Sequence, residues 1–245
     1  MLVIKSLLRM FPMCGVFFVV SIISATGSAF FLLQYSNLDT QNDMAVQIYS
    51  VLQQSTCLAI PFLYRWICCL GKNEKVKIGV GMLCGVVSCI FAWQLEVYRL
   101  KEVSHLVDKK KGNTSISFLW LIPQFFVLGC MEGLTREGIS KFFTSQLKEE
   151  QLQGYQEEYI EFVMGLGKLL NILIILTLKG WLGDTINDSR LDKYYMVLIG
   201  VGSVNFIAYC CIARCFYKDQ DMADNEFELK HWIEHVVDIE QNQDF

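Results

Sequence analysis

The chain has 245 residues, of which 53% are hydrophobic, 13% aromatic and 19% charged, and its formal net charge is −4. Its charged fraction is below the roughly 25% of soluble domains, and its apolar residues gather in runs of about 20, which excludes a disordered chain and argues against a water-soluble domain. The only basic block is Lys109-Lys110-Lys111, so no nucleic-acid partner is expected. The composition therefore predicts an all-α integral membrane protein whose first partner is the lipid bilayer.

Six apolar segments are long enough to cross a hydrocarbon core of ~30 Å, which takes about 20 helical residues. Helices are required because lipid cannot hydrogen-bond an exposed backbone. The first, third and sixth segments are the most clearly apolar, whereas the second contains Gln53, Gln54 and Pro61 and the fifth contains Lys168. The six predicted spans are Phe11–Leu33, Ala45–Cys69, Val76–Tyr98, Ser117–Phe143, Tyr159–Trp181 and Tyr194–Phe216.

The first segment also has features of a cleaved signal peptide. Lys5 and Arg9 precede an apolar run that contains the small residues 24–29, where a cleavage site would lie. We favour a membrane span, because the apolar run continues to Leu33. The predicted organisation is a cytoplasmic segment over residues 1–10, a six-helix transmembrane bundle over 11–217 and an acidic cytoplasmic tail over 218–245.

The loop charges favour an orientation with both termini in the cytoplasm. Loops at that side contain Lys and Arg, whereas the loop over residues 37–43 contains neither; the three lysines at 109–111 oppose the trend. The chain has two glycosylation sequons, at Asn113 and Asn187, and both fall in loops that this orientation places outside. These two asparagines are the candidate glycosylation sites.

Several motifs resemble one transporter family. Trp120-Leu121-Ile122-Pro123-Gln124-Phe125, followed by Glu132 and Phe142-Phe143, is similar to the tenth helix of the plant nitrate/peptide transporters. These proteins are the plant branch of the proton-dependent oligopeptide transporter family, within the major facilitator superfamily. Further similar motifs are Lys5-Ser6-Leu7-Leu8-Arg9-Met10-Phe11-Pro12, Glu96-Val97-Tyr98-Arg99-Leu100 and the run from Asn187 to Tyr195.

The resemblance covers the second half of that family's fold. A complete member has twelve helices in two bundles, with the substrate bound between them, so the six predicted spans correspond to helices seven to twelve and residues 1–10 to the end of the central linker. The implied function is proton-coupled transport of nitrate, peptides or a similar small polar solute, inactive without the first six helices. The alternative is a truncated, non-transporting paralogue that binds full-length transporters. The plasma membrane is the expected location, with the vacuolar membrane as the alternative.

Charged residues within membrane spans are the main functional candidates. Glu132 matches the family's cavity-facing glutamate, which implies contact with the substrate or with a proton-linked gate. Arg136 lies at i+4 and can instead form a structural ion pair with Glu132. Lys168 can bind a substrate anion, extend its amine towards the membrane surface, or pair with Glu132 or Glu161. Gln124 can line a wet cavity or hydrogen-bond between helices.

Among the prolines within the spans, Pro61 and Pro123 are the candidate helix kinks, since proline removes a helical hydrogen bond. The three histidines lie outside the spans, and the ten cysteines show no paired Cys-x-x-Cys spacing. No catalytic constellation is visible either. The sequence therefore predicts no enzyme activity, no cofactor and no metal site.

Some residues depart from the family pattern. Tyr64 and Lys141 stand where the family has acids, and Arg136 stands where it has an uncharged residue. Glu157, Glu158 and Glu161 occupy positions that are normally small or apolar. These departures weaken the inference of activity but not that of ancestry.

Overall fold

The computed structural model describes the backbone of residues 2–31, 34, 43–67, 74–109, 118–146, 154–178 and 190–214, and these residues form no strand. The elements are α1 (Leu2–Thr26), the π-helix η1 (Gly27–Phe31), α3 (Asp43–Ile67), α4 (Glu74–Lys109), the 3-10 helix η2 (Phe118–Leu121), α5 (Ile122–Gln146) and α7 (Gln156–Thr177). A further helix over Leu191–Arg214 follows, which we call the last helix.

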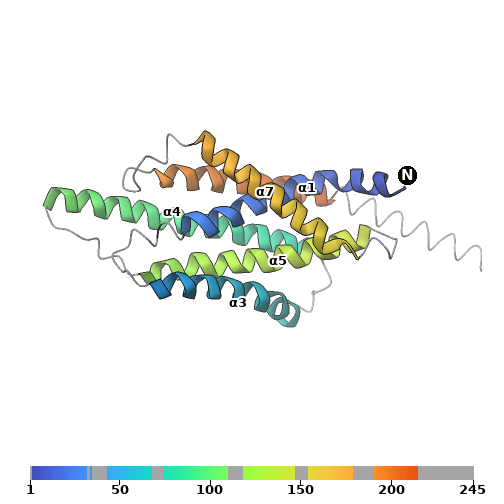
Figure 1. The fold of residues 1–245 in the computed structure, drawn as a ribbon, viewed down its shortest axis with the longest axis horizontal. Helices are drawn as coiled ribbons and strands as arrows, with labels where there is room; N and C mark the ends of the chain where they lie inside the picture. Colours follow the sequence, from blue (N-terminus) through green and yellow to red (C-terminus); the bar gives the residue numbers. More distant parts are fainter. Residues whose placement is uncertain are drawn as a thin grey trace, which may run out of the picture.

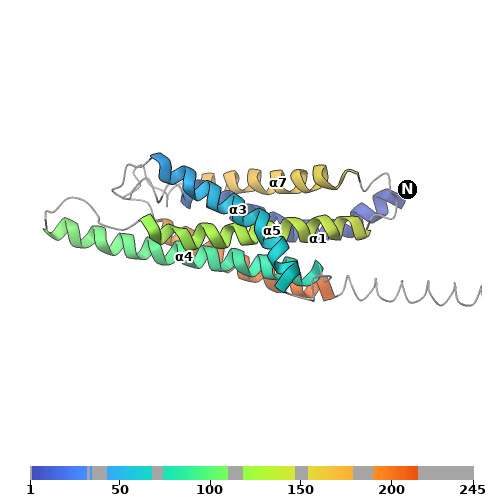
Figure 2. The ribbon, with the colours of Figure 1, turned by 90° about the horizontal axis from the view of Figure 1, so that it is seen from below.

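The helices form one elongated bundle in which successive helices run in opposite directions (Figure 1). Seen from below, α7 lies on one side, α4 and the last helix lie on the opposite side, and α5 and α1 lie between them; α3 begins on the side of α7 and crosses obliquely towards the side of α4 (Figure 2). The start of α1 and the C-terminal ends of α3, α5 and the last helix lie at the same end, which we call the N-terminal end of the bundle. This up-and-down order is the one that consecutive membrane spans require.

A helix forms over each of the six predicted segments, and four are long and apolar enough to cross a membrane. By contrast, α3 contains three glutamines, and α5 contains Glu132, Arg136 and Glu137. The part of the chain that the structure describes is therefore a helical bundle with four candidate spans. They are Pro12–Phe31, Glu74–Glu102, Gln156–Thr177 and Leu191–Arg214.

The helix ends differ from the predicted span ends. Helix α1 begins at Leu2 rather than Phe11, and α4 continues to Lys109, well beyond Tyr98. Hydrophobicity identifies the part of a helix that lipid can surround, whereas polar residues can extend the helix on either side. Several predicted regions lie outside the described residues. They are the span ends at 68–69, 179–181 and 215–216 and the tail at 218–245.

Helix α5 lies at the centre of the bundle and makes its most extensive contacts with α4 and α3. Its contact with α3 depends on two glycines one turn apart. A Cβ atom at Gly129 would lie 2.5 Å from the carbonyl oxygen of Gln53, and one at Gly133 would lie 2.7 Å from Cγ2 of Ile60. The two backbones therefore approach as closely as in membrane helix pairs that contact through small residues.

Replacing Gly133 with valine is expected to destabilise the fold by ~1–3 kcal/mol, because the added atoms have no space against α3. Thermal unfolding in detergent measures this change as a lower midpoint. The matched control is Gly200→Val on the last helix, where no atom lies within 4 Å of an added Cβ. Equal midpoint shifts for the two variants would show that the α3–α5 contact is not glycine-dependent.

The first helix changes form at Gly27, where the α-helix becomes the π-helix η1. An added Cβ at Gly27 would clash with the Leu128 side chain of α5. Gly27, one of the small residues at 24–29 that also suggested a cleavage site, thus allows close packing between α1 and α5. Short π-helical turns are frequent at functional sites, and the predicted candidate Glu132 contacts this same part of α1.

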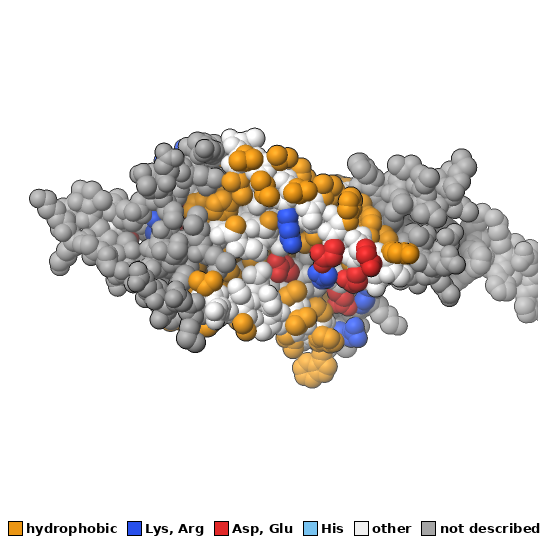
Figure 3. All heavy atoms as spheres, viewed as in Figure 1, with side chains coloured by type: hydrophobic (Ala, Val, Ile, Leu, Met, Phe, Trp, Pro, Cys, Tyr) orange, Lys and Arg blue, Asp and Glu red, His pale blue; other side chains and the backbone are white. Residues whose placement is uncertain are grey.

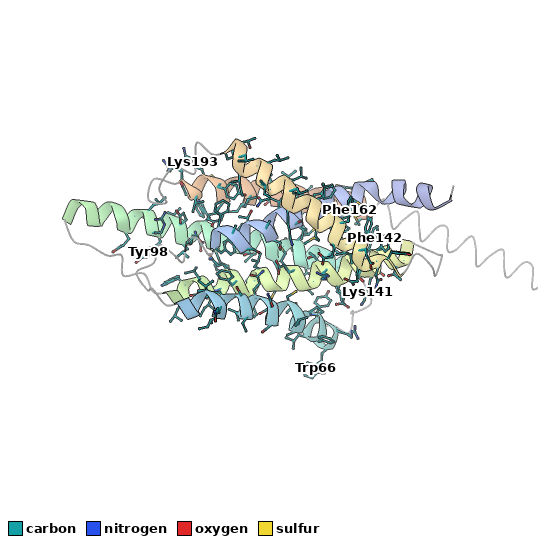
Figure 4. All side chains as sticks on the ribbon, in the orientation of Figure 1. Trp66, Tyr98, Lys141, Phe142, Phe162 and Lys193 are labelled. Atoms are coloured by element: carbon teal, nitrogen blue, oxygen red, sulfur yellow. The ribbon has the colours of Figure 1, made fainter. Side chains whose placement is uncertain are left out.

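Aromatic side chains lie at both ends of the bundle. Trp66 projects outward from the end of α3 and is 85% exposed, while Tyr98 lies towards the opposite end (Figure 4). The ring of Tyr98 stacks on Trp120 of η2 with centroids 6.4 Å apart. Trp and Tyr gather at both membrane–water interfaces, so this distribution agrees with helices that cross a bilayer.

Candidate functional site

Charged side chains gather near the middle of the face seen in Figure 3, among hydrophobic and uncharged groups. They belong to α5 and α7. We call this surface the charged face and define it by Glu132, Arg136, Glu157, Glu161 and Lys168. Helices α3 and α7 border it in the view of Figure 1, and α4 and the last helix lie behind it.

Glu132 joins three helices at the centre of this face. Ser24 of α1 donates a hydrogen bond to Oε1 of Glu132 at 2.5 Å, and Nε2 of Gln53 on α3 donates to Oε2 at 2.9 Å. Each carboxylate oxygen thus accepts one bond from a neutral donor on a different helix. The charge of Glu132 is solvated by hydrogen bonds while the side chain stays partly exposed, so it can still reach a proton or a solute.

Arg136 pairs with α7 and not with Glu132. Its Nη2 atom lies 3.1 Å from Oε2 of Glu157 and 2.7 Å from Oε1 of Glu161, and all three side chains are more than half exposed. Three residues that depart from the family pattern therefore form one ion-pair cluster. The structure therefore does not show the ion pair between Glu132 and Arg136 that the i+4 spacing suggested.

Lys168 lies seven residues, or two helical turns, after Glu161 and so on the same side of α7. It is exposed, and among the described residues it makes no ion pair with Glu132 or Glu161. The charged face thus holds one carboxylate bound only by neutral groups and one lysine without an acidic partner.

Gln124 lies away from the charged face, in a fully buried polar network. Its Nε2 atom donates to Oε1 of Gln34 at 3.4 Å, and Gln34 donates to Oε2 of Glu96 at 3.1 Å. Arg99 donates to both oxygens of Glu96, at 2.6 and 3.1 Å. Of the two roles considered for Gln124, the structure supports hydrogen bonding between helices.

The two predicted kink residues have different positions. Pro61 lies inside α3, and α3 changes direction towards its C-terminal end (Figure 2). Pro123 is the second residue of α5, directly after η2, where a proline removes no helical hydrogen bond; it does not kink the helix interior. Pro12 lies inside α1, a third position that the sequence analysis did not single out.

A second charge cluster lies at the N-terminal end of the bundle, and sequence reasoning missed it. Oε1 of Glu137 lies 2.7 Å from Nζ of Lys77, 2.7 Å from Nζ of Lys141 and 3.7 Å from Nη2 of Arg65. Lys77 is fully buried, and its Nζ also lies 5.6 Å from the ring centroid of Tyr64. Glu137 of α5 is the shared acidic partner of these three cations. The basic residue at Lys141 is accounted for, because it pairs with Glu137 one turn earlier on the same helix.

The structure does not place the predicted glycosylation sites. Asn113 and Asn187 lie outside the described residues. Over the part of the chain that the structure places, no group of three or more His, Cys, Asp or Glu side chains is arranged to hold a metal ion.

The coupling free energy between Arg136 and Glu161 depends on whether water surrounds the charged face. Since both side chains are more than half exposed, we expect a coupling free energy of ~0.2–1 kcal/mol between them, as for solvated pairs. A double-mutant cycle with Arg136→Gln and Glu161→Gln, read by unfolding in detergent, measures it. A coupling of about 3 kcal/mol or more, as for buried pairs, would contradict a solvated face.

The chain matches known proteins along most of its length. The PTR2 model of the POT family matches residues 2–183. Protein NRT1/PTR FAMILY 5.6 of Arabidopsis thaliana is 32% identical over 158 residues, which are 60% of this chain and 26% of that relative. Protein NRT1/PTR FAMILY 5.9 of the same plant is 23% identical over 252 aligned positions, or 92% of this chain and 45% of the relative.

The matched part is less than half the length of each of these curated relatives. Within it, the matching region of the family model contains the whole charged face. With several helices long and apolar enough to cross a membrane, the chain is a multi-pass membrane protein. It belongs to the POT family of transporters and is similar to the plant NRT1/PTR proteins.

Proposed function

We propose that these six helices all cross the membrane and form the second bundle of a proton-coupled transporter of nitrate, peptides or a similar small polar solute. The observation that carries the proposal is the charged face. Ionisable side chains at membrane depth are too costly to face lipid, so this face requires a wet cavity or a covering protein. In the resemblance set out above, such a cavity lies between two bundles of six helices.

In this proposal the charged face is one wall of the cavity. Helices α3 and α5 are less apolar than the other four because they line water rather than lipid. Glu132 takes up a proton or contacts a polar group of the solute, and Lys168, without an acidic partner on this face, attracts an anionic group. The paired Arg136 fixes α5 against α7 and does not contact the solute.

The proposed orientation places both termini in the cytoplasm, so that the Glu137 cluster lies at the cytoplasmic side. The plasma membrane is the proposed location, with the vacuolar membrane as the alternative. Protons and the solute are the proposed partners besides lipid.

The test joins this chain to the N-terminal six-helix half of Protein NRT1/PTR FAMILY 5.6 and measures uptake of labelled nitrate and dipeptides with and without an inward proton gradient. We expect gradient-dependent uptake of at least one solute by the joined protein. The N-terminal half expressed alone to the same level is the control. Uptake no greater than in that control, despite correct delivery to the membrane, would argue against the proposal.

A second candidate is a non-transporting paralogue that binds full-length transporters. It is favoured by the ion pairs of Arg136, because the resemblance implies an uncharged residue at that position. Here the charged face would be covered by another protein. Co-expression of the chain with a full-length relative should then give co-purification and lower uptake, whereas an unchanged uptake would exclude it.

A further inference from the structure

A long apolar groove runs between α4 and the last helix. It has a volume of about 430 Å³ and is lined on α4 by Val76, Gly79 and Leu83, and on the last helix by Phe206, Tyr209 and Arg214. We call it the outer groove. Its volume lies within the ~300–1,000 Å³ range of ligand pockets. Val76 and Leu83 are 43% and 45% exposed, so the groove opens to the surroundings.

The outer groove lies away from the charged face. Helix α4 and the last helix lie on the side of the bundle opposite α7 (Figure 2), so the groove opens away from the proposed cavity and towards the surrounding bilayer. The backbone carbonyl of Lys75 accepts a hydrogen bond from the Tyr209 hydroxyl at 2.7 Å. This bond holds the first turn of α4 on the last helix and fixes the shape of the groove there.

Two cations mark one end of the outer groove. Lys75 and Arg214 both line it, one at the beginning of α4 and one at the end of the last helix, so both lie at the N-terminal end of the bundle, where a span meets the membrane surface. The rest of the groove extends from this end along apolar side chains into the bilayer. A ligand that fits needs an anionic head and an apolar chain attached to it.

We propose that the outer groove binds one anionic phospholipid, with an acyl chain along Gly79 and Leu83 and the phosphate near Lys75 and Arg214. Basic pockets between membrane helices at the cytoplasmic side bind anionic lipid head groups in this way. The site is independent of transport and of Glu132. It gives the protein a preference for anionic over zwitterionic lipid.

The test titrates the purified 245-residue chain with dioleoyl-phosphatidylglycerol or dioleoyl-phosphatidylcholine and measures binding by native mass spectrometry. Each basic side chain near the surface contributes about 1 kcal/mol to the binding of anionic lipid, or about fivefold in affinity. We therefore expect Lys75→Gln and Arg214→Gln each to weaken phosphatidylglycerol binding about fivefold and to leave phosphatidylcholine binding unchanged.

Two further variants separate the groove from general surface charge. Arg190→Gln removes an exposed cation next to the other end of the last helix and should leave both affinities unchanged. Val76→Trp fills the groove and should weaken the binding of both lipids. Equal affinity of the unchanged protein for the two lipids, or equal losses with Arg190→Gln and Arg214→Gln, would overturn the proposal.

The source of the phosphate is tested by competition. Glycerophosphoglycerol, the head group without its chains, should not displace bound phosphatidylglycerol at similar concentrations, because the apolar contacts are absent. Displacement at such concentrations would identify a site for free phosphate esters and would overturn the lipid assignment.

Discussion

Replacing Glu132 with glutamine is expected to lower proton-driven uptake by the joined protein by roughly 10- to 100-fold. A hydrogen bond to a charged group contributes ~1.5–3 kcal/mol, and glutamine cannot accept from both Ser24 and Gln53 through its two terminal atoms. It also cannot take up a proton. Initial rates of uptake measured over a range of external pH test this expectation, and the variant should lose the pH dependence along with the rate.

The matched control for this variant is Glu158→Gln, the same chemical change at an exposed position of α7. It should leave both the rate and the pH profile as they are. If Glu132→Gln lowers the rate but keeps the pH profile, Glu132 serves only as a structural partner of Ser24 and Gln53.

Replacing Glu96 with leucine is expected to destabilise the fold by ~3–5 kcal/mol, the largest effect that we predict on stability. Glu96 is fully buried and Arg99 is 3% exposed, so the variant leaves a buried guanidinium without this carboxylate. Gln34 loses one of its two acceptors at the same time and keeps the Ala92 carbonyl oxygen. The thermal unfolding midpoint in detergent should fall accordingly.

Two comparisons isolate the buried pair. Glu102→Leu, six residues further along α4 and partly exposed, should change the midpoint little. The double variant Glu96→Leu with Arg99→Met should regain much of the loss, because it removes both charges together. A midpoint for the single Glu96 variant equal to that of the Glu102 variant would show that the pair does not stabilise the bundle.

The sequence was sufficient to predict the helical class and the approximate place of every long helix, because runs of about 20 apolar residues have few other structures in a bilayer. It was insufficient for the helix ends. Helix α4 reaches Lys109 through residues as polar as Glu102, and apolar runs do not record such extensions. The π-helix η1 left no distinctive signal either, beyond the small residues around Gly27.

The sequence singled out Glu132 and Lys168 as site candidates, since charge at membrane depth is rare, and their functional role stays a prediction. The partner of Arg136 was missed because i+4 spacing favours a pair within one helix, whereas the carboxylates of Glu157 and Glu161 come from α7. The departures at Arg136, Glu157 and Glu161 looked unrelated in the sequence, and only the packing of α5 beside α7 shows that they form one cluster.

The central claim is that the charged face lines a water-filled cavity, and Lys168 tests it most directly. The joined protein in membrane vesicles is treated with a water-soluble, membrane-impermeant amine reagent, and the modified lysines are mapped by mass spectrometry. We predict that Lys168 is modified although it lies within a candidate membrane span, whereas the fully buried Lys77 is not. An unmodified Lys168, in vesicles where the exposed Lys193 reacts fully, would contradict the claim and place this face against lipid or protein.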